Sequence, residues 1–363
     1  MLEIRPLTGL RGLCAVWVML FHAFFCPRFL GTPLDWITSA GYMGVNVFFV
    51  LSGFVLAYNY ANSTWTPRSY LLFLRKRFAR IYPLHAFMLL VFVFVTWLVS
   101  LTGVRLLPPA FTGLPDLVRA LLLVHAWDAV ARFPWNGPSW TISAEWAAYL
   151  VFPLVAWVAT RIQTAAVAVT LVVLLYVLFA AWFHHPSLDL GVARRLPQLA
   201  SSFCAGVLLW RLASLTPRTL LDDKVATLVL VLLIFGASAS NMIARADVAA
   251  PRFAIVAAAV VYFVARSDGW LGRFLSMPVM LHLGRISYSL YLVHILLMYL
   301  SDIIIPGSRL PWLIRVAAVA LAVICAHCLY TWIEEPFRKV LTGSRPPVAL
   351  SNPQKLKPLG TSA

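Results

Sequence analysis

Charged side chains are scarce in this chain. Only 12% of its 363 residues are Asp, Glu, Lys or Arg, and only 13 residues are acidic, whereas soluble domains carry about 25% charged residues. Hydrophobic residues make up 61% of the sequence, and the mean hydropathy is +0.85. This composition excludes a soluble globular protein and predicts an integral membrane protein.

Cysteines and nucleotide-binding or hydrolase motifs are also few or missing. The cysteines are Cys14, Cys26, Cys204, Cys325 and Cys328. Their odd number, in or beside apolar runs, argues against a disulfide framework. The run from Cys325 to Cys328 resembles half of a metal site, but no second pair accompanies it, so we expect no metal. The sequence contains no GxGxxG, Walker loop, HExxH or GxSxG motif, so none of the functions that these motifs mark is indicated.

The chain is instead rich in long apolar runs. Ten are long enough, or nearly so, to cross a bilayer core of about 30 Å. We place them near 7–26, 41–60, 82–102, 139–159, 163–183, 198–214, 224–244, 250–267, 280–300 and 312–333. An eleventh run, 117–127, is too short to span and is interpreted as interfacial or re-entrant. The first run lacks the basic head and cleavage site of a signal peptide, so we expect it to be retained.

The positions of Arg and Lys orient this all-α membrane protein of about ten helices. With the N-terminus in the cytoplasm, the cytoplasmic segments hold 17 Arg and Lys residues and the opposite side holds 9. The positive-inside rule therefore predicts that both termini are cytoplasmic. Residues 1–340 form one polytopic domain in this interpretation, and residues 341–363 form a disordered cytoplasmic tail. The net charge of +16 follows from this bias and from contact with anionic lipid, so no nucleic-acid partner is expected.

The first apolar run carries an arginine and a histidine. Arg11 and His22 are eleven residues apart, which on a helix places them on one face and about 16 Å apart along the axis. Ionisable groups inside a membrane are costly and are functional candidates. The alternative is that Arg11 extends to the head groups and His22 caps the far end of the helix.

One carboxylate stands out among the acids. Glu145 lies in the first two turns of the fourth run, whereas nearly all other acids lie in loops or at the ends of runs. We expect it at the depth of His22, where a carboxylate would orient an imidazole and keep it basic. The alternative is a simple charge at a helix N-terminus.

Two further runs carry polar side chains. In the ninth, Ser287, Tyr291 and His294 share one helix face and would line a wet cavity or join helices by hydrogen bonds. In the second, Asn46 and Ser52 are the strongly polar residues of a glycine-containing segment. The sequence alone does not decide between these roles.

A basic segment precedes the third run. Arg75, Arg77 and Arg80 lie at its cytoplasmic end. Arginine suits phosphate oxygens, so this segment could hold a phosphorylated co-substrate such as coenzyme A. The alternative is that topology alone places positive charge there.

Six segments in order resemble the membrane-bound acyltransferase family 3, multi-pass enzymes that O-acylate carbohydrates and some secondary metabolites. They are LRGLCAVWVMLFHA, GYMGVNVFFVLSGFVLAY, RKRFARIYP, PSWTISAEWAAYLVFP, GRISYSLYLVH and IEEPFRK. Each segment alone is a weak signal, but six of them in the family's order on a ten-span protein are specific. The resemblance covers nearly the whole chain.

The resemblance assigns roles to positions of this sequence. The family's arginine–histidine motif falls on Arg11 and His22, and its histidine is held to be essential. The family's other motifs fall on Ser139, Trp140 and Glu145, on Arg77 to Pro83, on Ser287 to His294 including Tyr288, and on Glu334 and Pro336, where we expect a structural role. Many relatives have aspartate where this chain has Asn46, so only hydrogen bonding is expected there.

The family resemblance implies an acyl-CoA-dependent O-acyltransferase, of the class that transfers groups other than amino-acyl groups. Acyl-CoA from the cytoplasm, with acetyl-CoA expected, would be a co-substrate and not a tightly bound cofactor. We expect its phosphates on Arg75, Arg77 and Arg80. His22, backed by Glu145, would take a proton from an acceptor hydroxyl, with Arg11 organising the same face or the donor's route.

The expected acceptor is a hydroxyl of a lipid-linked or cell-surface polysaccharide, in the cytoplasmic (inner) membrane of a bacterium. An antibiotic or another small metabolite is the alternative acceptor. A transporter of a polyol or glycan is the alternative from another class, because intramembrane charges suit that function too. The sequence contains no inverted repeat that would support it, and it does not indicate an oligomeric state.

Overall fold

The helical architecture expected from the apolar runs is confirmed. The computed structural model describes residues 3–25, 33–107, 112–127, 135–183, 195–243, 246–305 and 311–343. Over these ranges every regular element is a helix and none is a strand. Nine helices of the described chain are long and apolar enough to cross a membrane. The expected span at 250–267 corresponds to a helix at Ala246–Arg266, of which Phe253–Arg266 forms a shorter apolar helix.

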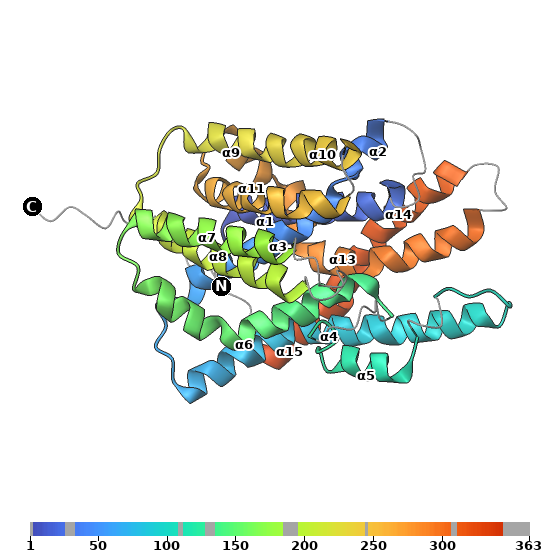
Figure 1. The fold of residues 1–363 in the computed structure, drawn as a ribbon. Helices are drawn as coiled ribbons and strands as arrows, with labels where there is room; N and C mark the ends of the chain where they lie inside the picture. Colours follow the sequence, from blue (N-terminus) through green and yellow to red (C-terminus); the bar gives the residue numbers. More distant parts are fainter. Residues whose placement is uncertain are drawn as a thin grey trace, which may run out of the picture.

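The elements follow one another as an elongated bundle (Figure 1). In chain order they are α1 (Arg5–Leu20), η1 (Phe21–Phe25), α2 (Pro33–Thr38), η2 (Gly41–Met43), α3 (Gly44–Tyr60), α4 (Pro67–Ser100), α5 (Leu114–Leu121), η4 (Gly137–Ser139), α6 (Trp140–Thr160), α7 (Ala165–Phe183), α8 (Arg195–Leu215), α9 (Asp222–Val231), η5 (Leu232–Gly236), α10 (Ala237–Ile243), α11 (Ala246–Arg266), α12 (Trp270–Leu275), α13 (Pro278–Ile304), α14 (Pro311–Leu329), η7 (Tyr330–Glu334) and α15 (Glu335–Thr342). The pair α9 and α11 forms one edge of the bundle, and α4 with α5 forms the opposite edge (Figure 1).

Helix α4 begins much earlier than the apolar run that predicted it. Pro67 occupies the first turn, and Thr66 and Ser69 form a capping box in which each side chain bonds to the other's backbone N–H. The basic segment was expected to lie in a cytoplasmic loop, but it forms the first turns of this 34-residue helix. The arginines are therefore held in fixed directions around a helix.

The short eleventh run does not span the molecule. Residues Leu114–Leu121 form the amphipathic helix α5, and Leu123 then adopts a left-handed backbone conformation with φ 58°. A non-glycine residue with positive φ ends a helix because the right-handed hydrogen-bond ladder cannot continue through it. This agrees with the prediction that the run is too short to cross a membrane.

Helices α1 and α13 approach very closely. A Cβ atom on Gly12 would lie 2.7 Å from the backbone nitrogen of Gly284, a separation that real contacts do not reach. Glycine at both positions therefore lets the two backbones touch, as small residues do between transmembrane helices. Farther along the same two helical segments, His22 of η1 contacts His294 of α13.

Candidate active site

A cavity of about 770 Å³ lies between α1, α3, α4, α6, α13 and the η7–α15 segment. Basic side chains outnumber acidic ones in its lining, with seven basic and three acidic residues. The basic ones are Arg11, Lys76, Arg77, Arg80, Arg285, Arg338 and Lys339, and the acidic ones are Glu3, Glu145 and Glu335. The cavity is therefore suited to an anionic ligand, and its volume is in the range of small-molecule sites.

The two ends of the cavity differ in character. Glu3, at the start of the described chain, and Thr342, near its end, both line the cavity, and the end of the cavity at which they lie is called its mouth. At the deep end, Phe48 packs edge-to-face against Tyr291, with ring centroids 5.9 Å apart, and Thr141 donates to the Tyr291 hydroxyl at 3.3 Å. Of the predicted tail, residues 341–342 belong to α15, and residues 344–363 lie outside the described residues.

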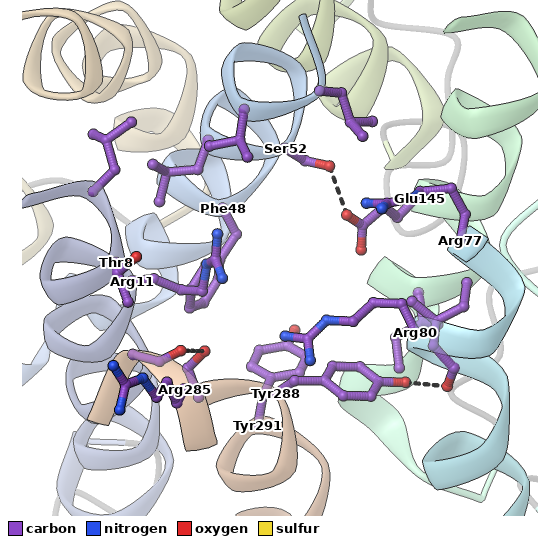
Figure 2. A pocket seen from close by; sticks show the side chains of 18 of the residues that line it. Thr8, Arg11, Phe48, Ser52, Arg77, Arg80, Glu145, Arg285, Tyr288 and Tyr291 are labelled. Atoms are coloured by element: carbon purple, nitrogen blue, oxygen red, sulfur yellow. Dashed lines mark hydrogen bonds between the residues drawn. The ribbon is translucent and has the colours of Figure 1, made fainter. Parts of the chain in front are cut away.

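Glu145 faces the middle of the cavity. Its Oε1 accepts hydrogen bonds from Ser52 on α3 at 2.6 Å and from Tyr149, one turn along α6, at 2.5 Å. Figure 2 shows Ser52 and Glu145 joined at the rim of the space, with Arg77 beside them and Arg11 on the opposite wall. The carboxylate thus lies among cations and hydroxyl groups of the cavity wall.

The expected pair between His22 and Glu145 is wrong. His22 is half-buried in η1, where its Nδ1 lies 3.0 Å from the Val18 carbonyl oxygen and 3.3 Å from Nε2 of His294. The two residues do not lie at equal depth. Thr141 and Tyr291 are in contact and mark a common level; Glu145 lies one turn nearer the mouth than Thr141, whereas His294, the partner of His22, lies farther from the mouth than Tyr291. The imidazole partner of His22 therefore comes from α13.

The three arginines expected to bind the donor have different surroundings. Arg77 is buried against the rings of Tyr60 and Tyr149, with its guanidinium carbon 5.6 Å and 5.9 Å from their centroids. Arg80 lines the cavity and forms an ion pair with Glu334. Arg75 is exposed and donates to the Leu341 carbonyl oxygen at 2.7 Å, outside the cavity lining. The expectation that Arg75 belongs to the same site is therefore not met.

Four of the eight residues expected to line the cavity do so, namely Ser52, Ser287, Tyr288 and Tyr291. The other four are absent from its lining. Asn46 is fully buried and accepts from Gln198 on α8 at 3.0 Å. Ser139 is buried beside His125, Trp140 packs edge-to-face on Phe49, and His294 contacts His22. Those side chains join helices to one another, which was the alternative for polar residues inside the bundle.

Glu334 and Pro336 lie where η7 passes into α15, within the continuous helical segment Pro311–Thr342. The Glu334 carboxylate, with 1% of its side chain exposed, pairs with Arg80 and accepts from Ser289 at 2.7 Å. It joins η7 to α4 and α13. Pro336 occupies the first turn of α15, directly after the π-helical turn η7.

Several residues of the site were missed from the sequence. Lys76, Arg285 and Arg338 line the cavity beside the predicted residues. Tyr149 was missed too, although it lies four residues after Glu145, and residues at this spacing are neighbours on a helix face. Arg285 and Arg338 could have been found, because each lies beside a motif at the same membrane side as Arg77.

The described part of the chain contains no candidate metal site. Over the described ranges, no three His, Cys, Asp or Glu side chains are grouped so that they could hold a metal ion. Cys325 and Cys328 are free thiols in α14.

Together the helical membrane fold and the cationic cavity define a multi-pass membrane protein with a site for an anionic ligand. A family profile described as an acyltransferase domain matches residues 5–331. The chain belongs to the membrane-bound acyltransferase family 3 and is an acyltransferase.

Individual relatives agree with this assignment. The protein named "Acyltransferase MdmB" of Streptomyces mycarofaciens is 30% identical over 96% of this chain and 94% of its own length. The protein named "Putative O-acetyltransferase SACOL0978" of Staphylococcus aureus is 23% identical over 93% of this chain and 57% of its own length. The chain thus spans little more than half of the latter relative. No solved structure is significantly similar to it.

Proposed function

We propose that the protein transfers an acyl group, most simply acetyl, from acyl-CoA to a hydroxyl of a carbohydrate acceptor such as a lipid-linked or cell-surface polysaccharide. The observation that carries this proposal is the cationic cavity between α1, α3, α4, α6, α13 and the η7–α15 segment. Acyl-CoA is an anion because of its phosphate groups, and guanidinium groups bind phosphate oxygens with paired hydrogen bonds. The names of the relatives support O-acyl transfer, and they do not identify the acceptor.

The cavity supports an orientation for the donor. Arg285, Arg338 and Lys76 line it toward the mouth and would bind the nucleotide phosphates. The pantetheine arm would extend past Arg11 toward Tyr291, beyond which lie His294 and His22. The mouth would face the cytoplasm of a bacterial cell, where acyl-CoA is made, in accordance with the expected cytoplasmic termini.

The chemistry follows from this placement. The acceptor oxygen attacks the thioester carbonyl carbon while His22 takes the hydroxyl proton. The new C–O bond forms, the C–S bond breaks with its electron pair on sulfur, and the coenzyme A thiolate takes up the proton. Arg11 would line the route of the donor, on the mouth side of the transfer point. Ser52, Glu145 and Tyr149 would form the polar wall of the donor site.

A transfer assay tests the proposal. The purified protein in detergent is incubated with acetyl-CoA and either a polysaccharide acceptor, a lipid-linked oligosaccharide or a small hydroxylated metabolite. Released coenzyme A thiol and the acylated product are measured. Acylation of one of the carbohydrates is the expected result. Acylation of the small metabolite alone would mean that the acceptor is a metabolite and not a carbohydrate. If no acceptor caused release of the thiol, the proposed function would be contradicted.

A further inference from the structure

The hydrogen-bond partners of His22 and His294 determine which ring nitrogen of each histidine carries the hydrogen. Nδ1 of His22 lies 3.0 Å from the Val18 carbonyl oxygen, and Nδ1 of His294 lies 3.1 Å from the Leu290 carbonyl oxygen. Each histidine thus bonds back to the carbonyl four residues earlier. Because a carbonyl oxygen can only accept, each Nδ1 must carry a hydrogen. In a neutral imidazole the other ring nitrogen, Nε2, is then an acceptor.

The remaining short contact agrees with this assignment. Nε2 of His294 lies 3.3 Å from Nδ1 of His22, and the ring centroids are 5.1 Å apart. The Nδ1 hydrogen of His22 is therefore shared between the Val18 carbonyl and the His294 Nε2, a three-centre bond. His294 is 1% exposed, so this contact lies away from bulk water. Both ring nitrogens of His294 and Nδ1 of His22 are then occupied, and within the described part of the chain Nε2 of His22 keeps a free lone pair.

We propose that His294 is a positioning residue that holds His22 in the tautomer with a free Nε2, so that Nε2 of His22 takes the proton from the acceptor hydroxyl. This inference rests on the proposed function. As in other nucleophile–base–orienter arrangements, the third group fixes the orientation of the base and stabilises the imidazolium that forms. Here a neutral imidazole takes the place that a carboxylate usually holds, and Glu145 remains free for the donor cavity.

The close crossing of α1 and α13 explains how the pair is held. Gly12 and Gly284 let the two backbones touch, and Ser287 and Tyr291 continue the same face of α13 toward His294. The His294 ring also packs 5.8 Å from the Tyr291 ring at the deep end of the cavity. The base is thereby placed next to the end of the cavity where the thioester is expected.

Two variants of similar length separate an acceptor role from a packing role. His294→Gln keeps an oxygen near the position of Nε2, whereas His294→Met fills similar space with a sulfur that accepts hydrogen bonds only weakly. The kcat of His294→Met should fall about 10- to 100-fold, less than the loss expected for removal of the base itself. His294→Gln should retain most of the wild-type kcat. The KM for acyl-CoA should be unchanged in both, because the cavity lining is intact.

The control is His85→Leu, which removes another buried histidine. Its Nε2 lies 2.9 Å from the Ala120 carbonyl oxygen. It should leave the kcat of the folded fraction unchanged. If His294→Met does not fold, His294→Asn replaces it, because its shorter amide cannot reach the Nε2 position.

The outcomes distinguish the positioning role of His294 from the proposed acyl transfer. Wild-type activity in the Met or Asn variant, or an equally low kcat in the Gln variant, would overturn the positioning role while acyl transfer stands. A wild-type protein that acylates no acceptor would overturn the proposed function itself.

Discussion

Glu145 and His22 lie at different depths of the molecule. Thr141 bonds to Tyr291 at 3.3 Å, so Glu145 lies about 6 Å nearer the mouth and His294 about 4.5 Å farther from it. Along the helix axes, Glu145 and His294, the partner of His22, are therefore about 10 Å apart. We therefore expect the two residues to act in different parts of the reaction, Glu145 on the donor side and His22 at the transfer point.

Independent action of these residues gives the first prediction. His22→Ala should lower kcat by about 10²- to 10⁴-fold, and Glu145→Gln should cause a smaller loss. Because distant sites contribute additively in free energy, the double variant should show the product of the two losses. Steady-state kinetics of the three variants check this. A double variant as slow as His22→Ala alone would mean that the two residues act as a unit.

The ion pair between Arg80 and Glu334 gives the second prediction. Removing Arg80 would leave the carboxylate of Glu334, 1% exposed, without its cation. Such a loss costs about 3 kcal/mol, so Arg80→Ala should lower the Tm of the purified protein.

The control for this prediction removes the negative charge of Glu334. In the Glu334→Gln background, Arg80→Ala should have a smaller effect on Tm, because no buried charge is left unpaired. Equal shifts in both backgrounds, measured by thermal unfolding in detergent, would show that the pair contributes nothing to stability.

At the scale of helices, the crossing of α1 and α13 sets the geometry of the histidine pair. Gly12→Ala would place a Cβ atom 2.7 Å from the Gly284 nitrogen and 2.8 Å from the Leu283 Cβ. The helices must then separate, at a cost of about 1–3 kcal/mol. The contact between His22 and His294 would lengthen, so kcat should fall together with Tm.

The control for this helix prediction is Gly236→Ala in η5. Its Cβ would meet only the side chains of Phe253 and Leu232, at 3.0 and 3.2 Å. Its kcat per folded molecule should equal that of the wild type, whatever its Tm. A normal kcat in Gly12→Ala as well would show that the crossing does not control the reaction.

The apolar pattern predicted the helices well, and the site only in part. Ser52, Tyr288 and Tyr291 lie on the cavity wall as expected, because helical periodicity fixes which residues share a face. The prediction that Glu145 pairs with His22 was wrong because the depth of a residue within a span depends on helix tilt and packing. The start of α4 at Pro67 was missed because apolarity marks the membrane core, and helices continue beyond it.

At the scale of the whole molecule, both described ends of the chain lie at the cavity mouth. Glu3 and Thr342 line it together, and an even number of crossings would place both termini on one side of the membrane. The excess of Arg and Lys predicts that this side is cytoplasmic. The donor would then enter from the cytoplasm, and the acceptor would approach His22 from the far half of the bundle.

The most direct measurement is acyl transfer in proteoliposomes of known orientation. An affinity tag on the C-terminus, probed with an impermeant protease, separates vesicles with the mouth outward from those with the mouth inward. Labelled acetyl-CoA added outside should be used only by vesicles whose C-terminus is outside, and Arg77→Lys should raise the apparent KM for it without changing orientation. Equal use of external acetyl-CoA by both populations would contradict a donor site at this mouth.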